Sequence, residues 1–251
     1  MTLSQALGVT AGAAVALVGG GGKSTAMFLL AREAVARGGR AVTTTTTRIF
    51  GAQIALSPIH VPATEATRER VDAALASHGQ VLVIGEVEQA SGKAEGISLG
   101  LFRDLRAWFP DAVLVNEADG SRMRPFKAPA GHEPVIPPET TLVVPVVGAD
   151  IFGKPLDDDH VHRAELIAGL TGVALGTPIT PAVVAGVLAH ANGGRKGVPP
   201  AARVVVLVNK ADLAMAAARE TAERLLREAA IDRVVLAAVR GEKPVLEVCR
   251  R

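Results

Sequence analysis

The sequence predicts an α/β fold with a mainly parallel sheet of about seven strands flanked by helices. Short runs rich in Val, Leu and Ala alternate with longer segments of helical character, which is the pattern of successive βα units. The short runs are continuously apolar, as expected of strands buried on both faces. We expect strands at residues 13–18, 40–44, 81–84, 112–115, 142–147, 204–208 and 234–239, and helices at 23–37, 66–77, 99–109, 162–170, 181–191 and 213–230.

The composition favours a folded, cytoplasmic protein. Of 251 residues, 49% are hydrophobic and 21% are charged, which excludes the composition of a disordered chain. The 27 basic and 25 acidic residues form no long block of one sign, so we expect neither a nucleic-acid nor a membrane partner. The apolar run before Gly19 is too short for a membrane span. The single cysteine, Cys249, cannot form an internal disulfide, which suits a reducing compartment.

We interpret residues 1–251 as one α/β domain. The Gly- and Pro-rich connection at residues 193–200 allows a minor boundary near residue 195. The longest stretch without a predicted element is 120–141, where five prolines exclude a continuous helix or central strand. Long ordered loops of this kind are often functional.

A phosphate-binding loop is predicted between the first strand and the first long helix. A glycine-rich turn at the start of a helix points backbone N–H groups at an anion, and a following Lys and Ser can contact phosphate and Mg²⁺. Leu17 stands where the full Walker pattern has glycine, so this is the shorter G-x-x-G-K-[ST] form. The alternative is a merely flexible turn. The expected nucleotide-binding residues are Gly19, Gly20, Gly21, Gly22, Lys23, Ser24 and Thr25.

Two acids follow the fourth predicted strand. Glu117 and Asp119 are two residues apart, so they face the same side of an extended chain, and either could hold a metal-bound water or position an attacking group. We expect catalytic roles for Lys23, Glu117 and Asp119, and Mg²⁺ ligation by Ser24, Asp119 and Thr45 of the Thr-rich run 43–47. The alternatives are solvated loop acids and a plain β-branched strand.

The segment N-K-x-D at Asn209, Lys210 and Asp212 follows a predicted buried strand and matches the guanine-recognition motif of GTPases. In that motif the aspartate accepts two hydrogen bonds that adenine cannot offer, the lysine stem lies over the base, and the asparagine ties loops together. Each motif falls where a parallel strand ends, which is where α/β sheets bind nucleotides. We therefore expect GTP, with ATP as the alternative.

Several segments together resemble one protein family. The proline-spaced block from Lys127 to Pro137 is the most specific of them, and the resemblance extends over nearly the whole chain. The chain resembles the YqeC-type accessory family of selenium-dependent molybdenum hydroxylases. The segments are 19–25, the Thr-rich run through Arg48, 117–121, 124–137, 147–156 and the pair His162-Arg163.

The resemblance implies a role in maturing the selenium-containing cofactor of enzymes such as xanthine dehydrogenase and purine hydroxylase, with nucleotide binding or hydrolysis. A molybdenum hydroxylase or its cofactor is the implied partner. The candidate substrate-binding residues are Arg124, Lys127, His132, Glu133, His162 and Arg163.

The loop cations Arg122, Arg124, Lys127 and His132 could hold the phosphate of a pterin or nucleotide substrate, or could be ordinary exposed residues. The run of three acids at 157–159 precedes His160 and His162, but we expect helix capping by Asp159 there, not a metal site.

Three hypotheses remain open on the sequence. The first is an accessory protein, a slow Mg²⁺-dependent NTPase. The second is a small-molecule kinase or a Mur-type ligase. The third is a carrier that grips a nucleotide-bearing pterin without hydrolysis.

Overall fold

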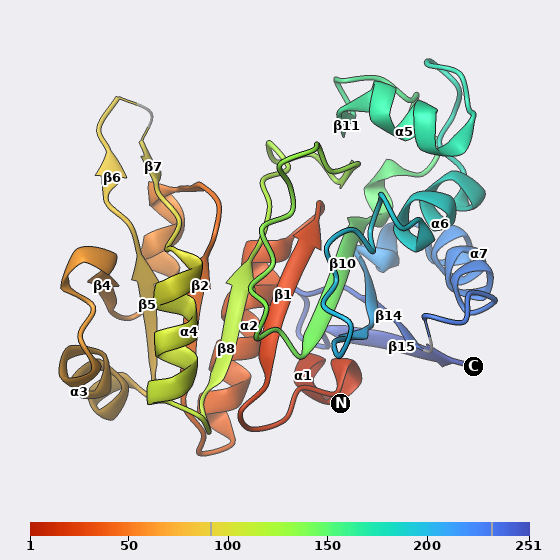
Figure 1. The fold of residues 1–251 in the computed structure, drawn as a ribbon. Coiled ribbons are helices and arrows are strands. Elements are labelled where there is room, and N and C mark those ends of the chain that lie inside the picture. Colours follow the sequence, from red (N-terminus) through yellow and green to blue (C-terminus); the bar gives the residue numbers. More distant parts are fainter. Residues whose placement is uncertain (91, 232) are drawn as a thin grey trace.

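The computed structural model describes residues 1–90, 92–231 and 233–251 and contains a ten-stranded sheet (Figure 1). Its strand order is β15-β14-β13-β10-β1-β8-β2-β5-β4, with β12 also paired to β10. Every pair is parallel except β14 with β15, so the predicted α/β fold with a mainly parallel sheet is confirmed. The strands are β1 (Ala14–Gly19), β2 (Ala41–Thr45), β4 (His60–Pro62), β5 (Gln80–Ile84), β8 (Val113–Glu117), β10 (Leu142–Gly148), β12 (Arg203–Val204), β13 (Val206–Asn209), β14 (Arg233–Ala237) and β15 (Val245–Arg250).

Helices cover both faces of this sheet, as the continuous apolar strands require (Figure 1). Helices α1 and α2 pack on one face, where alternate residues of the central strands, such as Val15 and Leu17 of β1, are fully buried. The other face carries α3 and α4 over β2, β5 and β8, and α5 to α7 over β10, β13 and β14. The helices are α1 (Leu3–Leu7), α2 (Lys23–Ala36), α3 (Arg68–His78), α4 (Leu99–Trp108), α5 (Ala164–Thr171), α6 (Pro181–Ala189) and α7 (Met215–Leu225).

A loop, not a helix, covers the middle of the second face. Between α4 and α6, the β1 residues Ala16 and Val18 are buried under Ile136 of the proline-rich segment and Val198 and Ala202 of the later connection. The amide of Val135 donates to the carbonyl of Ala118 at 2.9 Å, which attaches the loop to the end of β8. The predicted long connection is therefore an ordered part of the core.

All seven predicted strands are present, and the sheet is larger than the prediction. The edge strands β4 and β15 and the short helix α1 were not predicted, and β12 and β13 together correspond to one predicted strand. Five two-residue strands form two small sheets. These strands are β9 (Phe126–Lys127) paired with β11 (Val161–His162), and β7 (Lys93–Ala94) paired with both β3 (Ile49–Phe50) and β6 (Val87–Glu88).

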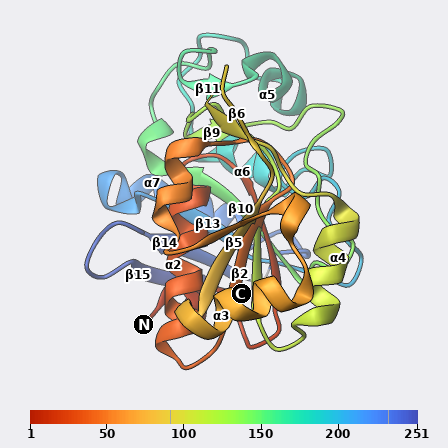
Figure 2. The same ribbon diagram turned by 90° about the vertical axis from the view of Figure 1, so that its left-hand side faces the viewer.

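The small sheets lie beyond the carboxyl ends of the central strands. Figure 2 shows β6 together with β9, β11 and α5 above this edge of the large sheet. The chain runs from β1 toward β2 on one side and from β8 to β10 on the other, so connections diverge at β1. Such a divergence opens a crevice at the carboxyl ends of the strands. Four 3₁₀ helices border these connections, at Gly51–Leu56, Ala63–Glu65, Ala149–Ile151 and Ala211–Leu213.

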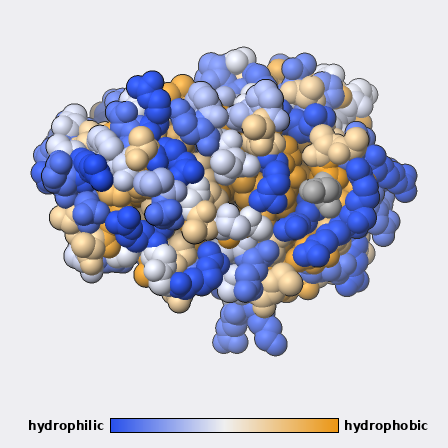
Figure 3. All heavy atoms as spheres, turned by 60° about the horizontal axis from the view of Figure 1, so that its bottom comes forward, coloured by the Kyte–Doolittle hydropathy of each residue, from blue (hydrophilic) through white to orange (hydrophobic). Residues whose placement is uncertain are grey.

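The opposite end of the molecule, near the amino ends of the strands, has a predominantly hydrophilic surface with smaller hydrophobic areas between the polar groups (Figure 3). Among the described residues, no helix has both the length and the apolar character needed to cross a membrane.

Candidate functional site

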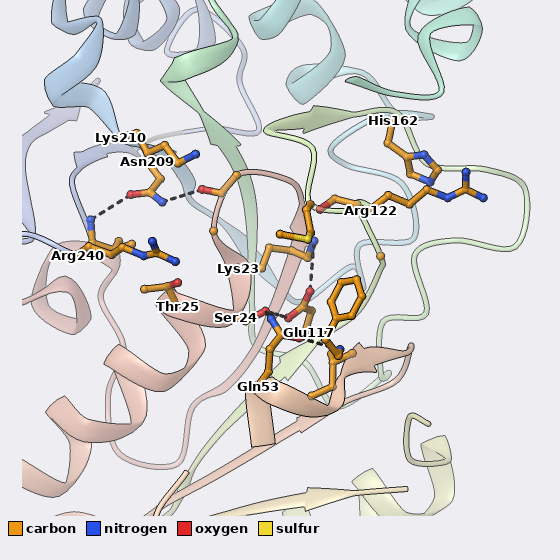
Figure 4. Close-up of a pocket in the computed structure, with 18 of the residues that line it drawn as sticks. Lys23, Ser24, Thr25, Gln53, Glu117, Arg122, His162, Asn209, Lys210 and Arg240 are labelled. Atoms are coloured by element: carbon orange, nitrogen blue, oxygen red, sulfur yellow. Dashed lines mark hydrogen bonds and ion pairs between the residues drawn. The ribbon is translucent and has the colours of Figure 1, made fainter. Parts of the chain in front are cut away.

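A large cleft lies at the carboxyl edge of the sheet and has a volume of about 980 Å³. It runs from the loop after β13, across the start of α2, to the two small sheets, and Figure 4 shows side chains from all of these elements turned toward it. Its size is in the range of small-molecule and cofactor sites. Lining residues that bear on function are Gly21, Gly22, Lys23, Ser24, Thr25, Thr47, Gln53, Glu117, Arg122, Glu133, His162, Arg163, Asn209, Lys210, Asp212 and Arg240.

The predicted phosphate loop joins β1 to α2 at the floor of this cleft. The first backbone hydrogen bond of α2 runs from Ala26 to Gly22, so the amides of Lys23, Ser24 and Thr25 have no acceptor in a preceding turn. These amides, at the positive end of the helix, can bind an anion. The amides of Gly19 and Gly20 instead donate to Asp119 and to the Val146 carbonyl, so these two predicted residues lie below the cleft.

Two of the glycines are required by close contacts. Gly21 has φ +81°, and a Cβ there would collide with the backbone of Gly148. Gly22 has φ +124°, and a Cβ there would collide with the side-chain amide of Asn209. Since L-residues with side chains rarely adopt such φ values, both the conformation and the space favour glycine.

Lys23 is buried beneath the loop between two carboxylates. Its Nζ lies 3.4 Å from Glu117 Oε1 and 3.3 Å from Asp119 Oδ1, and it donates to the Gly19 carbonyl at 2.5 Å. Burial alone would lower the pKa of Lys23, but attraction to Asp119 and Glu117 outweighs it and raises the pKa above the ordinary 10.5. The lysine therefore stays charged.

Ser24 and Glu117 bring two oxygen donors together at the edge of the cleft. Ser24 Oγ donates to Glu117 Oε2 at 2.6 Å and accepts from Gln53 Nε2 at 2.6 Å (Figure 4). A hydroxyl and a carboxylate are ligands suited to the hard cation Mg²⁺. Gln53 lies in the connection after β3, and no sequence pattern singled it out.

The expected metal ligands Thr45 and Asp119 face the protein interior instead. Thr45 is fully buried and its hydroxyl donates to the Glu117 carbonyl at 2.8 Å, whereas Thr47 lines the cleft. Both Asp119 oxygens accept from the Gly19 amide at 3.0 Å, and Asp119 does not line the cleft. Of the two acids left open by the sequence, Glu117 is the one that faces the cleft.

The N-K-x-D segment lies at the other end of the cleft. The Asn209 side chain donates to the Gly21 carbonyl at 2.7 Å and accepts from the Val239 amide at 3.1 Å, so it joins the phosphate loop to the loop after β14 (Figure 4). Lys210 has φ +56° and donates to Asp150 Oδ2 at 2.6 Å. Asp212 is exposed in the cleft wall. The contributions of Val239 and Asp150 were not predicted.

A chain of buried and partly buried charges connects the phosphate loop to the proline-rich segment and α5. Lys127 Nζ lies 3.1 Å from Asp119 Oδ2 and 2.5 Å from Glu133 Oε2. Arg163 forms a bidentate pair with Glu133, at 2.7 Å and 3.1 Å. We name Asp119, Lys127, Glu133 and Arg163 the charge chain. Burial would raise the pKa of Glu133, but hydrogen bonds and charges from Arg163 and Lys127 lower it to about 2.

The predicted substrate residues are divided among the charge chain, the clefts and the surface. Lys127 is buried with its ammonium fully paired, so it supports structure and is not available to a substrate. The side chain of His132 is 78% exposed and lies outside both clefts of this region. Arg124, His162 and Arg163 line a smaller adjoining cleft, and the latter two also line the large one.

Acids of the run before α5 accept hydrogen bonds from backbone amides. Asp158 Oδ1, not Asp159 as expected, accepts from the Ala164 amide at 3.0 Å at the helix start. Asp157 Oδ1 lies 2.7 Å from His160 Nδ1. No group of three or more His, Cys, Asp or Glu side chains positioned to hold a metal ion occurs within residues 1–90, 92–231 and 233–251.

Comparison with known families identifies the chain. The family model described as "YqeC protein" matches residues 15–165, which include the phosphate loop, Glu117 and the charge chain. The chain belongs to the YqeC family. The N-K-x-D segment lies outside the matched residues, so the match is narrower than the resemblance seen in the sequence.

A relative from Escherichia coli strain K12, named "Uncharacterized protein YqeC", is 35% identical over 100 residues. The aligned part covers 40% of this chain and 39% of that protein. The chain therefore matches about two-fifths of the length of this relative.

Glu133→Gln is expected to lower the free energy of unfolding at pH 7 by about 3 kcal/mol, because Lys127 and Arg163 lose the charge that they share in a buried position. The folded-state pKa of about 2 lies below the ordinary 4.5, so this stabilisation is complete above pH 4.5 and disappears as the pH falls toward 2. Urea unfolding of both proteins across this range measures the difference.

The matched control is Glu65→Gln, which removes an exposed ion pair with Arg70 and is expected to cost less than about 1 kcal/mol. If the free energies of unfolding of wild type and Glu133→Gln differ by the same amount at pH 7 and at pH 2, the role assigned to the charge chain is contradicted.

Proposed function

We propose that this YqeC-family chain binds a Mg²⁺-nucleotide, with GTP favoured, hydrolyses it slowly, and acts in maturation or insertion of the selenium-containing cofactor of molybdenum hydroxylases. The observation that carries the nucleotide part is the Asn209 bridge. It joins the glycine-rich loop to the loop after β14, and the N-K-x-D segment that carries it lines the same cleft as the glycine-rich loop.

The phosphates would bind over the free amides of Lys23, Ser24 and Thr25, where the dipole of α2 favours negative charge. Ser24 and Glu117 would hold Mg²⁺, which neutralises phosphate charge when bound. Lys23 already lies at this position, held by Glu117 and Asp119. A bound phosphate group would give the Lys23 ammonium another negatively charged partner besides these two carboxylates.

Glu117 is the acid placed to orient a water or an attacking group, since it is next to Ser24 and faces the cleft. Asp119 has a positioning role, because both of its oxygens hold the Gly19 amide and its charge is divided between Lys23 and Lys127. No strong base with an unpaired side chain is needed for slow hydrolysis, which agrees with the proposed rate.

Guanine preference is supported by the position of Asp212. Its carboxylate forms no hydrogen bond or ion pair with the other described residues, and it lies beside Lys210 in the cleft wall. An aspartate with both oxygens available can accept the paired N–H groups of guanine. The loop after β14, including Arg240, borders the same space.

The accessory role in cofactor maturation is supported by the resemblance and by family membership over residues 15–165. A second candidate, a group-transfer enzyme, is favoured by the length of the cleft. Past Ser24 the cleft continues to Phe50 and His162, which leaves room for an acceptor beyond the last phosphate.

Lys23→Met is expected to weaken Mg²⁺-nucleotide binding by at least about tenfold, since a buried charge-assisted contact is lost. Ser24→Ala, which leaves the buried ion pairs in place, is expected to remove the Mg²⁺-dependent part of the affinity. Equilibrium binding of GTP, ATP and CTP with and without Mg²⁺ measures both effects, and circular dichroism checks that the variants are folded. Equal nucleotide binding by wild type and both variants would rule out the proposed nucleotide site.

Asp212→Asn is expected to weaken GTP binding by about tenfold or more and to improve binding of xanthosine triphosphate, because an amide side chain complements xanthine instead of guanine. Competition binding of the two nucleotides measures the switch. Asp111→Asn, an exposed acid before β8 and outside the cleft, is the matched control. An unchanged ratio between the two nucleotides rules out base reading by Asp212.

Cells in which Lys23→Met replaces the wild-type protein are expected to produce molybdenum hydroxylase protein with reduced selenium content. Elemental analysis of the purified hydroxylase measures selenium and molybdenum per chain. Full selenium content together with lost nucleotide binding in the variant would separate the two halves of the proposal and refute the accessory role.

A further inference from the structure

A second cleft of about 500 Å³ adjoins the proposed nucleotide site and is lined by several cations. We name it the arginine cleft, after Arg122, Arg124 and Arg163, which line it together with His162, Asp158 and Glu165. Arg122, His162 and Arg163 also line the large cleft, so the two spaces meet at these three side chains. In Figure 4, Arg122 and His162 lie on the opposite side of Lys23 from Lys210.

Two of the arginines are available to a ligand. The side chains of Arg122 and Arg124 make no hydrogen bond or ion pair with any residue of the described ranges, whereas Arg163 is occupied by Glu133. Of the acids, Asp158 already accepts the Ala164 amide. Guanidinium groups present several N–H donors in a plane that matches phosphate oxygens.

The segment that carries the two arginines is held to the phosphate loop and to β10 by backbone hydrogen bonds. The amide of Gly21 donates to the Arg124 carbonyl at 3.2 Å, and the amide of Gly148 donates to the next carbonyl, that of Pro125, at 2.8 Å. Arg122 and Met123 both have positive φ, at 50° and 64°. Such strained backbone in residues with side chains persists where the surroundings hold it, and is common at ligand sites.

The pKa of His162 is lowered by burial and by the charges around it. Burial, followed by the charges of Arg163, Lys127 and Arg122, lowers the pKa of His162 to about 4, and the opposing charge of Glu133 does not compensate. The imidazole is therefore neutral at pH 7. Burial is the main cause of this shift, and at His162 the charges of Arg163, Lys127 and Arg122 act against a positive charge as well.

We infer that the arginine cleft binds the phosphate group of a small second ligand, with Arg122 and Arg124 as its donors, directly beside the nucleotide. This inference adds a second ligand to the proposed function. It rests on that proposal only in assuming that a nucleotide occupies the neighbouring cleft. Because the cleft holds about 500 Å³ and opens into the large cleft, it suits a phosphorylated small molecule whose other end extends toward the last nucleotide phosphate.

The test is equilibrium dialysis of labelled inorganic phosphate against full-length protein, with the phosphate loop filled by excess Mg²⁺ and a non-hydrolysable GTP analogue. We expect one saturable phosphate per chain, at least about tenfold weaker in Arg122→Gln/Arg124→Gln. The matched control is Arg68→Gln/Arg103→Gln, which removes two exposed arginines outside both clefts and is expected to bind phosphate like wild type.

Competition by methyl phosphate, but not by acetate, is expected at the same concentration. No saturable phosphate binding, equal binding by the Arg122/Arg124 variant, an equal loss in the control variant, or equal competition by acetate would each overturn the inference.

The same measurement with Lys23→Met and no nucleotide separates the two proposals. Phosphate binding that persists in Lys23→Met and depends on Arg122 and Arg124 supports the arginine cleft even if no nucleotide binds. Phosphate binding that is lost in Lys23→Met and unaffected by the arginine substitutions places the anion on the phosphate loop and overturns the inference.

Discussion

The ammonium group of Lys23, buried between Glu117 and Asp119, is the interaction on which the site depends. Removing an ammonium from water costs several kcal/mol unless carboxylates and hydrogen bonds replace the solvent. Glu117 and Asp119 supply that replacement because β8 lies directly beside β1, with Leu17 in register with Glu117. Strand order therefore determines the chemistry, since a different neighbour for β1 would leave the lysine without partners.

Asp119 extends this arrangement beyond the phosphate loop. Its second interaction is with Lys127, and through Glu133 the alternating charges reach Arg163 at the start of α5. Asp119, Lys127 and Glu133 each lie between two opposite charges, and Arg163 ends the chain against Glu133. This pairing makes the burial of Asp119 and Lys127 and the partial burial of the other two tolerable. As a result, the proline-rich segment is ordered although its regular structure is limited to the two-residue strand β9. Its position is determined by ion pairs and by packing against β1.

The sheet was predictable because its strands are continuous apolar runs that end at polar residues, and every such run forms a strand. The elements that were missed lack this signal. The edge strand β15 has no fully buried residue and carries charges such as Glu247, and the two-residue strands are too short to show a period. Within the site, spacing identified Lys23, Ser24 and Asn209 as candidates. It could not distinguish Thr45 from Thr47, because the choice depends on where β2 ends and the chain turns.

The charge chain was not predictable from spacing either. Lys127 and Glu133 are six residues apart in a segment whose regular structure is limited to the two-residue strand β9, and Arg163 is thirty residues beyond Glu133. Their pairing follows from the contact of β9 with β11, which is a tertiary feature. From the sequence, the loop cations could be phosphate ligands or ordinary exposed residues, and the structure places them in different environments. Lys127 belongs to the interior, while Arg122 and Arg124 face a cleft.

The Asn209 bridge has a consequence for synthesis of the protein. The phosphate loop is translated well before its support, because the side chain that holds the Gly21 carbonyl lies 188 residues further along and the amide that holds that side chain a further 30 residues on. Domains fold as units during translation once their partners have emerged from the ribosome. A nascent chain that has not yet released residue 239 has the glycine-rich turn without this support, so the turn can reach its native arrangement only after that residue has left the ribosome.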